Sequence, residues 1–217
     1  MLHAQILGTV PHGFSTREEP ALESVLPGAP LVLAKQVHSS EVVTVTAPWE
    51  ASPPHADALV TDRSGLLIGV VTADCAPVLL ADPEADVVGA AHAGWRGALN
   101  GVLENTVAAM ERLGARRERI VAAIGPTIAQ ASYEVDAALR EGFPKHANHF
   151  FVPGAPGCWQ FDLPGFVAQR LHGAGVTAIE DLAEDTYAQE ARFFSFRRAT
   201  HRGEATGGRQ TSMIGIA

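Results

Sequence analysis

The stretch LLIGVVTADCAPVLLADPEADVVGAAHAGWRG, residues 66–97, predicts the centre of the fold. Its apolar runs have the length and composition of buried β-strands. These runs span residues 66–72, 78–81 and 87–91. Cys75, in the motif TADCAP, and His92, in the motif AHAGWRG, each stand at the end of an apolar run. Because both are metal-ligating residue types, the same stretch predicts a sheet core and a candidate metal site.

Outside this stretch, strand-like runs outnumber helical patterns. Further strands are expected at residues 31–33, 42–46, 58–61, 120–124, 177–179, 193–196 and 213–216. Apolar positions recur at helical spacing over residues 99–113, and Asp162 with Pro164 opens a second amphipathic helix. Because the strands come in runs rather than in strict alternation with helices, we expect an α+β fold with mixed sheets covered by helices.

Composition limits the class of protein. With 217 residues, 47% of them hydrophobic, the chain can bury a substantial core, and we expect one domain over residues 1–217. A net charge of −8, 6% aromatic residues and no Lys/Arg run argue against a nucleic-acid partner. Neither a signal peptide nor a membrane-length apolar run is evident, so we expect a cytoplasmic protein with no membrane partner. Two cysteines argue against a disulfide framework.

Three candidate metal ligands come from separate parts of the chain. His38, in the motif KQVHS, joins Cys75 and His92, and thiolate and imidazole groups are good ligands for zinc. No fourth ligand is evident, and an open coordination position is how catalytic zinc is held. A set this widely spaced forms a site only after folding. The alternative is that Cys75 is a small core residue and that His92 is a hydrogen-bonded histidine at a strand end.

Polar residues near the ligands favour a functional site. Asp74 precedes Cys75 in an otherwise apolar stretch and is a candidate for proton transfer or for orienting a metal ligand, although a purely structural role is as common. Arg96 lies in a glycine-flanked turn that opens a helix, a good place to bind phosphate or a carboxylate. Gln36 could bind substrate or satisfy a backbone group. Arg197 and Arg209 could approach a ribose or phosphate, or belong to a solvated charged face.

Several motifs resemble the YfiH/laccase-domain family, which is polyphenol oxidase-like and is also called the peptidoglycan editing factor family. They are KQVHS (35–39), HADALVTD (55–62), TADCAPVLLAD (72–82), GAAHAGWRG (89–97), AAIGPTIAQASYEV (122–135) and FFSFRR (193–198). The order also matches, from about residue 31 to the C-terminus. The resemblance implies a four-layer α/β/β/α sandwich with mixed β-sheets, a YfiH-like fold that resembles a bacterial toxin with a Cys-His site.

The resemblance also implies function. It implies zinc held by His38, Cys75 and His92 in a purine nucleoside phosphorylase that acts on adenosine, inosine or methylthioadenosine, with adenosine deaminase side activity. Purine nucleosides and phosphate are then the partners, and the oligomeric state is not indicated. Zinc chemistry agrees, because zinc supplies a nucleophile for attack at purine C6 and, with Arg96, would place phosphate for attack at ribose C1′.

Three alternatives remain open. The protein could be a cysteine hydrolase that acts in peptidoglycan precursor editing. Cys75 would then be the nucleophile, and His92 or His38 would be its base. With copper as the metal, the protein would be a polyphenol oxidase, but multicopper oxidation needs several copper sites and many histidines. A zinc-stabilised binding module would need four closed ligands and would unfold on chelation.

The chain matches the family less well at two places. The segment HGFSTR (12–17) resembles the N-terminal family motif and makes Arg17 a candidate substrate contact. After this motif, relatives carry a Gly-rich loop and an Asn-Leu segment, whereas this chain has only the short acidic segment 18–30. Asp185-Thr186 stands where many relatives have Cys-Thr. Within HADALVTD, His55 and Asp57 match the family. A His-x-Asp pair before a strand is more often part of a capped loop than a catalytic pair.

Overall fold

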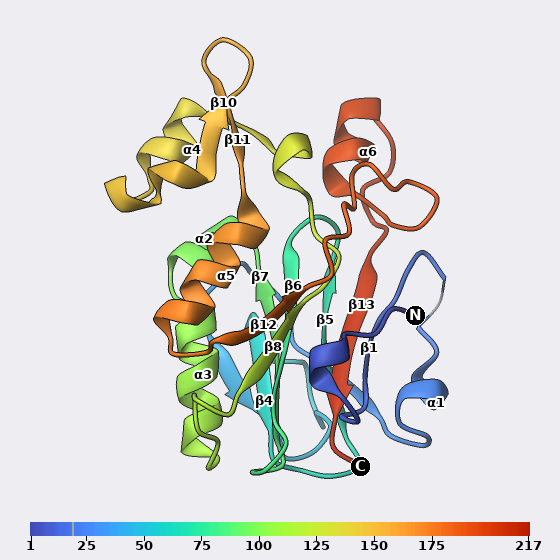
Figure 1. Cartoon of the computed structure of the whole chain (residues 1–217). Helices are drawn as coiled ribbons and strands as arrows, with labels where there is room; N and C mark the ends of the chain where they lie inside the picture. The colour runs from blue at the N-terminus through green and yellow to red at the C-terminus, as the bar shows by residue number, and fades with distance from the viewer. Residues whose placement is uncertain (19) are drawn as a thin grey trace.

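In the computed structural model, two stacked β-sheets form the centre of the molecule, and helices lie outside them (Figure 1). The structure describes residues 1–18 and 20–217, so Glu19, in the acidic segment discussed above, lies outside the described residues. The larger sheet has six strands and mixed pairing. In spatial order they are β12 (Ala178–Asp181), β8 (Val121–Ile124), β6 (Ala76–Asp82), β7 (Val87–Ala93), β4 (Ala58–Thr61) and β3 (Val42–Thr44).

Two smaller sheets complete the strands of the described chain. The four-stranded sheet, in spatial order, consists of β1 (His12–Phe14), β13 (Gln210–Gly215), β5 (Leu67–Thr72) and β2 (Leu31–Leu33). The three-stranded sheet consists of β10 (Phe151–Pro153), β11 (Cys158–Phe161) and β9 (Glu134–Asp136). The α-helices are α1 (Leu22–Val25), α2 (Trp95–Leu99), α3 (Val102–Arg112), α4 (Ala137–Glu141), α5 (Leu163–Gly173) and α6 (Phe196–Arg202). Short 3-10 helices are η1 (Gln5–Leu7), η2 (Gln130–Ser132) and η3 (Lys145–Phe150).

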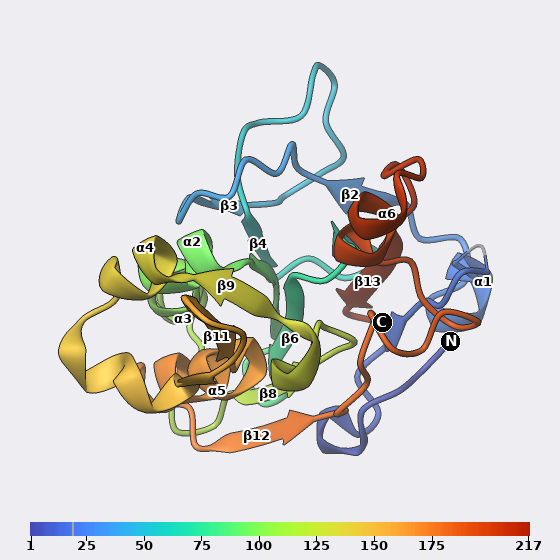
Figure 2. The ribbon, with the colours of Figure 1, turned by 90° about the horizontal axis from the view of Figure 1, so that it is seen from above.

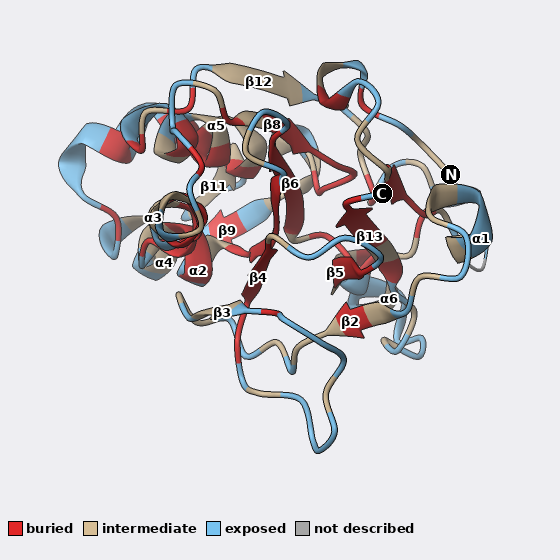
Figure 3. Cartoon of the chain, turned by 90° about the horizontal axis from the view of Figure 1, so that it is seen from below, coloured by how far each residue is buried: buried red, intermediate tan, exposed pale blue. Residues whose placement is uncertain are grey.

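The central strands of the six-stranded sheet are buried on both faces (Figure 3). In β6, Val78 and Leu80 belong to the apolar cluster that includes α3 and α5, whereas Leu79 and Ala81 belong to the cluster shared with the four-stranded sheet. Side chains alternate between the two faces of a strand, so both sets must be apolar when both faces are covered. This double burial is why the runs in residues 66–97 are continuously hydrophobic rather than alternating.

The layers follow the predicted order. Helices α3 and α5 cover one face of the six-stranded sheet, the four-stranded sheet covers the other, and α1 lies outside the four-stranded sheet (Figures 1 and 2). The fourth layer is thin, because α1 has only four residues. Val25 and Leu26, at its end, lie over Gly13 of β1 and Gly215 of β13. The α+β prediction with mixed sheets is confirmed.

Two predicted elements differ from the structure. The helix expected over residues 99–113 begins later, as α3, because Gly101 adopts a left-handed conformation with φ 95° that separates α3 from the short helix α2. The strand expected at residues 193–196 is wrong: this segment runs without regular structure into α6, whose amino end is capped by Ser195. Aromatic residues favour strands in isolation, but the cap and the tertiary contacts of this segment override that preference.

None of the helices in the described part of the chain combines the length and hydrophobicity needed to cross a membrane. The longest, α3 and α5, have 11 residues each. A helix that spans a bilayer needs about 20 apolar residues. Both helices instead bury one face in the core, through side chains such as Met110 and Phe166.

Candidate metal and substrate site

The pairing of β6 with β7 brings Cys75 and His92 together at one end of these two central strands. Ala76 pairs with Ala93, and Pro77 pairs with His92, so Cys75 immediately precedes the paired part of β6. His38 arrives from the segment after β2, where a bridge between Lys35 and His55 holds the chain beside the start of β4. The sequence places the three residues far apart, and the sheet register brings them together.

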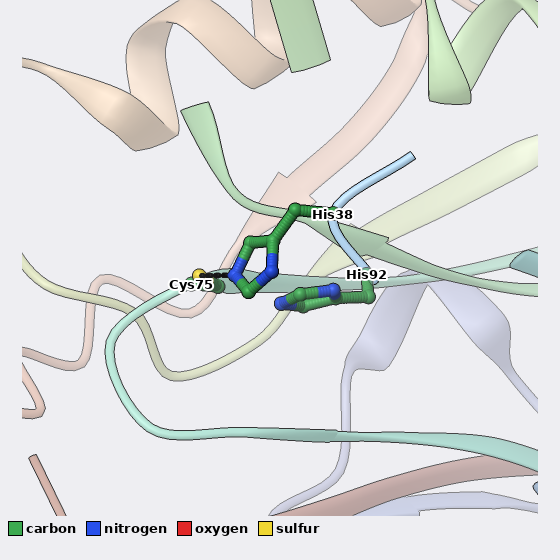
Figure 4. Close-up of side chains that lie close together, drawn as sticks. All are labelled: His38, Cys75 and His92. Atoms are coloured by element: carbon green, nitrogen blue, oxygen red, sulfur yellow. Dashed lines mark hydrogen bonds between the residues drawn. The ribbon is translucent and has the colours of Figure 1, made fainter. Parts of the chain in front are cut away.

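His38, Cys75 and His92 form a compact group of potential ligands (Figure 4). Their ligand atoms all lie within 4.8 Å of one another, and the Cys75 Sγ is 3.8 Å from the His38 Nε2. The two imidazole rings meet edge to face, with 4.8 Å between their centroids. Within the described residues this is the one group of three or more His, Cys, Asp or Glu side chains that could hold a metal ion.

Asp57 holds two of the three ligands in place. One carboxylate oxygen accepts hydrogen bonds from the His38 amide at 3.0 Å and from the His92 Nδ1 at 2.8 Å. The other accepts from the amides of Val37 and Ser39 and from the Ser39 hydroxyl. Because Asp57 accepts from Nδ1 of His92, Nε2 is the nitrogen left to bind a metal ion once it has lost its proton, as in metal sites where a carboxylate fixes the tautomer of a ligating histidine.

The side chains in this group shift one another's pKa values. Burial alone raises the pKa of Cys75, but the neighbouring His92 and His38 outweigh it and lower the pKa to about 6. Burial lowers the pKa of His92, but Cys75 and the Asp57 carboxylate raise it to about 9. Burial also works against ionisation of Asp57, yet its bonds to His92 and Ser39 hold its pKa well below the ordinary range. At neutral pH the group therefore contains a thiolate, the form that binds metals.

Gly94 leaves room for the ligands. A Cβ atom at this position would lie 2.9 Å from the Cys75 Sγ and 3.1 Å from the His38 Cδ2. Real Cβ atoms essentially never come within 3.0 Å of another heavy atom, so the contact with the Cys75 Sγ would force a shift. The backbone of Gly94 has an ordinary extended conformation, with φ −70°, so the requirement for glycine comes from space and not from the dihedral angle.

A cavity of about 580 Å³ opens above these ligands. Its volume is within the range of about 300–1,000 Å³ that is usual for small-molecule sites. Its aromatic wall consists of Trp95, Tyr133 and Phe196, and Phe196 is 49% exposed although it is a large apolar residue. Burial and the nearby Cys75 raise the pKa of Tyr133, so its hydroxyl stays protonated and can donate a hydrogen bond.

Three arginines line the same cavity, and among the described residues none of them forms an ion pair with a carboxylate. They are Arg96, Arg197 and Arg209. Arg96 stacks on Trp95 at 4.5 Å, and Arg197 donates to the Glu134 carbonyl at 2.6 Å. Uncompensated guanidinium groups beside a cavity favour an anionic ligand.

The structure separates the other predicted contacts. Asp74 lines the cavity, but its carboxylate is engaged by three protein donors. Gln36 also lines it, and its amide forms two hydrogen bonds of 2.8 Å with the backbone of Val71, which is the structural role considered above. Arg17 lies elsewhere: its guanidinium stacks 4.6 Å over Phe194 and borders a different cavity of about 330 Å³.

Sequence reasoning missed three features of this site. It treated Asp57 as part of a capped loop, and it gave no role to Tyr133 or Phe196. The signal for Asp57 was its position two residues after His55 at the start of a buried strand, where a carboxylate needs several donors. Phe196 lies in the aromatic motif FFSFRR, but only the structure shows which of its aromatic residues faces the cavity.

Comparisons with known proteins agree with the motifs. A family model described as multi-copper polyphenol oxidoreductase laccase matches residues 15–217. A purine nucleoside phosphorylase of Deinococcus radiodurans is 42% identical over 183 residues, which cover 83% of this chain and 68% of the relative. An adenosine deaminase from an unknown prokaryotic organism is 37% identical over 182 residues, covering 77% and 70%.

A solved structure shares the fold. The crystal structure of the hypothetical protein YfiH from Bacillus licheniformis matches with a TM-score of 0.84 at 27% identity, covering 97% of this chain and 94% of that one. The chain belongs to the YfiH/laccase-domain family, which confirms the resemblance drawn from its motifs. The YfiH-like fold is confirmed as well.

Proposed function

We propose that this protein is a zinc-dependent purine nucleoside phosphorylase with adenosine deaminase side activity. The observation that carries the proposal is the placement of His38, Cys75 and His92 beside a cavity that combines aromatic side chains with arginines that form no ion pair among the described residues. The names of the relatives from Deinococcus radiodurans and the unknown prokaryote support the same two reactions.

The donor set fits zinc. Two imidazoles and a thiolate supply three ligands and leave one coordination position open, the arrangement of catalytic zinc sites. Asp57 fixes the tautomer of His92, and Gly94 leaves the space that the Cys75 Sγ needs. When bound, zinc would supply Lewis acidity and a nucleophile at neutral pH.

The protein side chains would bind and orient both substrates. Arg96, Arg197 and Arg209 would hold phosphate, because guanidinium groups bind its oxygens in a bidentate manner. Trp95 and Phe196 would pack against the purine base, as planar aromatic groups prefer offset or edge contacts with other rings. Holding phosphate and nucleoside in one cavity lowers the entropic cost of bringing them together for attack at ribose C1′.

The test is product analysis of adenosine incubated with the zinc-loaded protein, with and without phosphate. We expect adenine and ribose 1-phosphate when phosphate is present, and a smaller amount of inosine. Cys75→Ala should abolish both products, whereas Cys158→Ala, at the other free cysteine, should not. Cleavage of adenosine that does not depend on phosphate, or full activity of Cys75→Ala, would refute the phosphorylase.

A cysteine hydrolase is the second candidate, because His92 and His38 lower the pKa of Cys75 to about 6. A thiolate beside an imidazole is the arrangement of a cysteine nucleophile and its base. Mass spectrometry of the metal-free protein with an activated acyl donor would detect a covalent adduct at Cys75. An adduct that forms and then turns over would favour the hydrolase, and an inert thiol would exclude it.

Copper-dependent phenol oxidation has less support from the ligands. The described residues contain a single group that could hold a metal ion, whereas multicopper oxidation needs several copper sites. Copper is therefore the alternative metal rather than the proposed one. Copper added to the purified protein should oxidise phenols no faster than the same concentration of free copper.

A further inference from the structure

Asp74 has an unusual backbone conformation beside the candidate metal ligand Cys75. Its φ is 91°, in the left-handed region that residues other than glycine rarely adopt. Contacts with the chain after β8 hold this conformation: the Asp74 carbonyl accepts hydrogen bonds from the Thr127 hydroxyl at 2.7 Å and from the Ile128 amide at 2.9 Å. A strained conformation persists only where the surrounding structure fixes it.

The Asp74 carboxylate connects this loop to distant parts of the chain. One oxygen accepts from the Thr186 hydroxyl at 2.7 Å. The other accepts from the Ser195 hydroxyl at 3.0 Å and from the Arg197 amide at 2.7 Å. Ser195 in turn caps α6 by accepting from the Arg198 amide at 3.1 Å. Asp74 therefore extends the amino-terminal cap of α6 from a segment more than 100 residues away in sequence.

The first turn of α6 forms part of the cavity wall. Phe196 and Arg197 both line the cavity, and α6 lies above the four-stranded sheet, across from the three-stranded sheet (Figure 1). Arg198 stabilises the same region from behind, because its buried guanidinium donates to the carbonyls of Thr186 and Phe193. The Asp74 carboxylate thus connects this wall directly to the loop that carries Cys75.

We propose that Asp74 is a positioning residue, and not the proton-transfer group: its carboxylate holds Phe196 and Arg197 at a fixed distance from the Cys75 loop. Each oxygen of the carboxylate already accepts from a protein donor. The inference rests on the proposed function only in naming the nucleoside and phosphate as the ligands that this wall contacts. The connection itself follows from the hydrogen bonds.

Asp74→Asn separates positioning from proton transfer. The asparagine oxygen can accept from Ser195 and Arg197, and its NH₂ group can donate to the Thr186 hydroxyl, which accepts as well as donates. We expect Asp74→Asn to keep kcat and the KM for adenosine within about fivefold of wild type. A general acid or base contributes about 10²- to 10⁴-fold, so the same substitution would lower kcat by at least about 100-fold if Asp74 transferred a proton.

Asp74→Ala removes the connection. We expect it to raise the KM for adenosine by about tenfold or more and to speed amide hydrogen exchange at the start of α6 by a similar factor, with zinc content unchanged. Thr186→Val removes one of the three donors to Asp74 and should raise the KM and speed exchange in α6 to a smaller extent. Thr186 is buried and is not among the cavity-lining residues, so this effect would not come from lost contact with substrate. The matched control is Asp136→Ala, which removes the cap of α4 and should change neither KM nor exchange in α6.

Hydrogen exchange measured by mass spectrometry needs no turnover, so this test is independent of the proposed function. Wild-type protein without phosphorolysis would refute the function and leave the exchange result standing. Unchanged exchange in α6 for both Asp74→Ala and Thr186→Val would overturn the positioning role. So would an Asp74→Asn variant that loses kcat by 100-fold or more while its KM and its α6 exchange stay at wild-type values.

Discussion

Asp57→Asn should cost both stability and metal affinity, because the carboxylate serves five donors. An asparagine offers one oxygen, which can face the donors of residues 37 and 39, and its NH₂ group must then face the His38 amide and the His92 Nδ1. The His38 amide loses its acceptor, and His92 must present a lone pair at Nδ1. Its Nε2 then carries the proton and cannot bind a metal ion.

The magnitude follows from these two lost bonds. Each unsatisfied or weakened buried bond costs about 1–3 kcal/mol, so we expect the free energy of unfolding to fall by about 2–6 kcal/mol. Loss of a carboxylate that orients a ligating histidine lowers metal affinity about 10- to 100-fold. Urea unfolding of the metal-free protein measures the first effect, and zinc titration against a chromophoric chelator measures the second.

Two variants make the test specific. Asp82→Asn is the matched control, since Asp82 is also fully buried and bonded to Arg116 and Arg119, but lies at the far end of β6. It should lower stability comparably and leave zinc affinity unchanged. Ser39→Ala removes one donor and should give a smaller loss of both. Zinc affinity equal to wild type in Asp57→Asn, or an equal loss of affinity in Asp82→Asn, would refute the role given to Asp57.

The stability difference should also depend on pH. The folded state holds the pKa of Asp57 below its ordinary value of about 3.9. The stabilisation from its ionised form is therefore present above pH 4 and is lost as the pH falls through the lower pKa of the folded state. The contribution of the carboxylate to the difference between wild type and Asp57→Asn should shrink below pH 4. His92, whose pKa Asp57 helps to raise to about 9, adds a second contribution that is lost as the pH rises from about 6.5 to 9. A difference that persists undiminished at pH 3 would contradict this assignment.

Three further predictions address the ligands and the cavity. Gly94→Ala should lower zinc affinity at least about tenfold, because its Cβ would lie 2.9 Å from the Cys75 Sγ, whereas Gly207→Ala, with open space around it, should have no effect. Zinc affinity should rise about tenfold per pH unit from pH 6 to 9, because zinc binding displaces the proton of His92, and more steeply below pH 6, where Cys75 is also protonated. Calorimetry in buffers of different ionisation enthalpy would detect the released protons. A zinc affinity that does not change with pH would contradict the assignment. Arg96→Met should raise the KM for phosphate at least about tenfold. The free energy of unfolding should stay unchanged within about 0.5 kcal/mol, since Arg96 is exposed and forms no ion pair in the described structure. An unchanged KM for phosphate would show that Arg96 is not part of the phosphate site.

Sequence patterns predict the inner part of this molecule well. Strands buried on both faces must be apolar at every position, so β5, β6 and β7 stand out as continuous runs. Cys75 and His92 lie at the ends of these runs, and the antiparallel register of β6 and β7 then brings them together. His38 was predicted as the third ligand from its place just before the strand expected at residues 42–46.

The parts that were not predicted depend on long-range contacts. Asp57 has the local signature of a loop cap, and its role comes from donors on residues 37–39 and on His92. The aromatic segment 193–196 favours a strand in isolation, but Ser195 and Asp74 together start a helix there. The three-stranded sheet consists of short strands whose burial is incomplete, so its sequence shows no clear alternation.

Two buried aspartates divide the organisation of the site between them. Asp57 joins the segment that carries His38 to His92, so it sets the geometry within the metal ligands. Asp74 joins the loop that carries Cys75 to α6, so it sets the distance from the ligands to the cavity wall. Each is the same residue type next to a ligand segment, and the difference between them comes entirely from which donors the fold presents. A pocket built in this way can vary its wall, through α6, without altering its metal ligands.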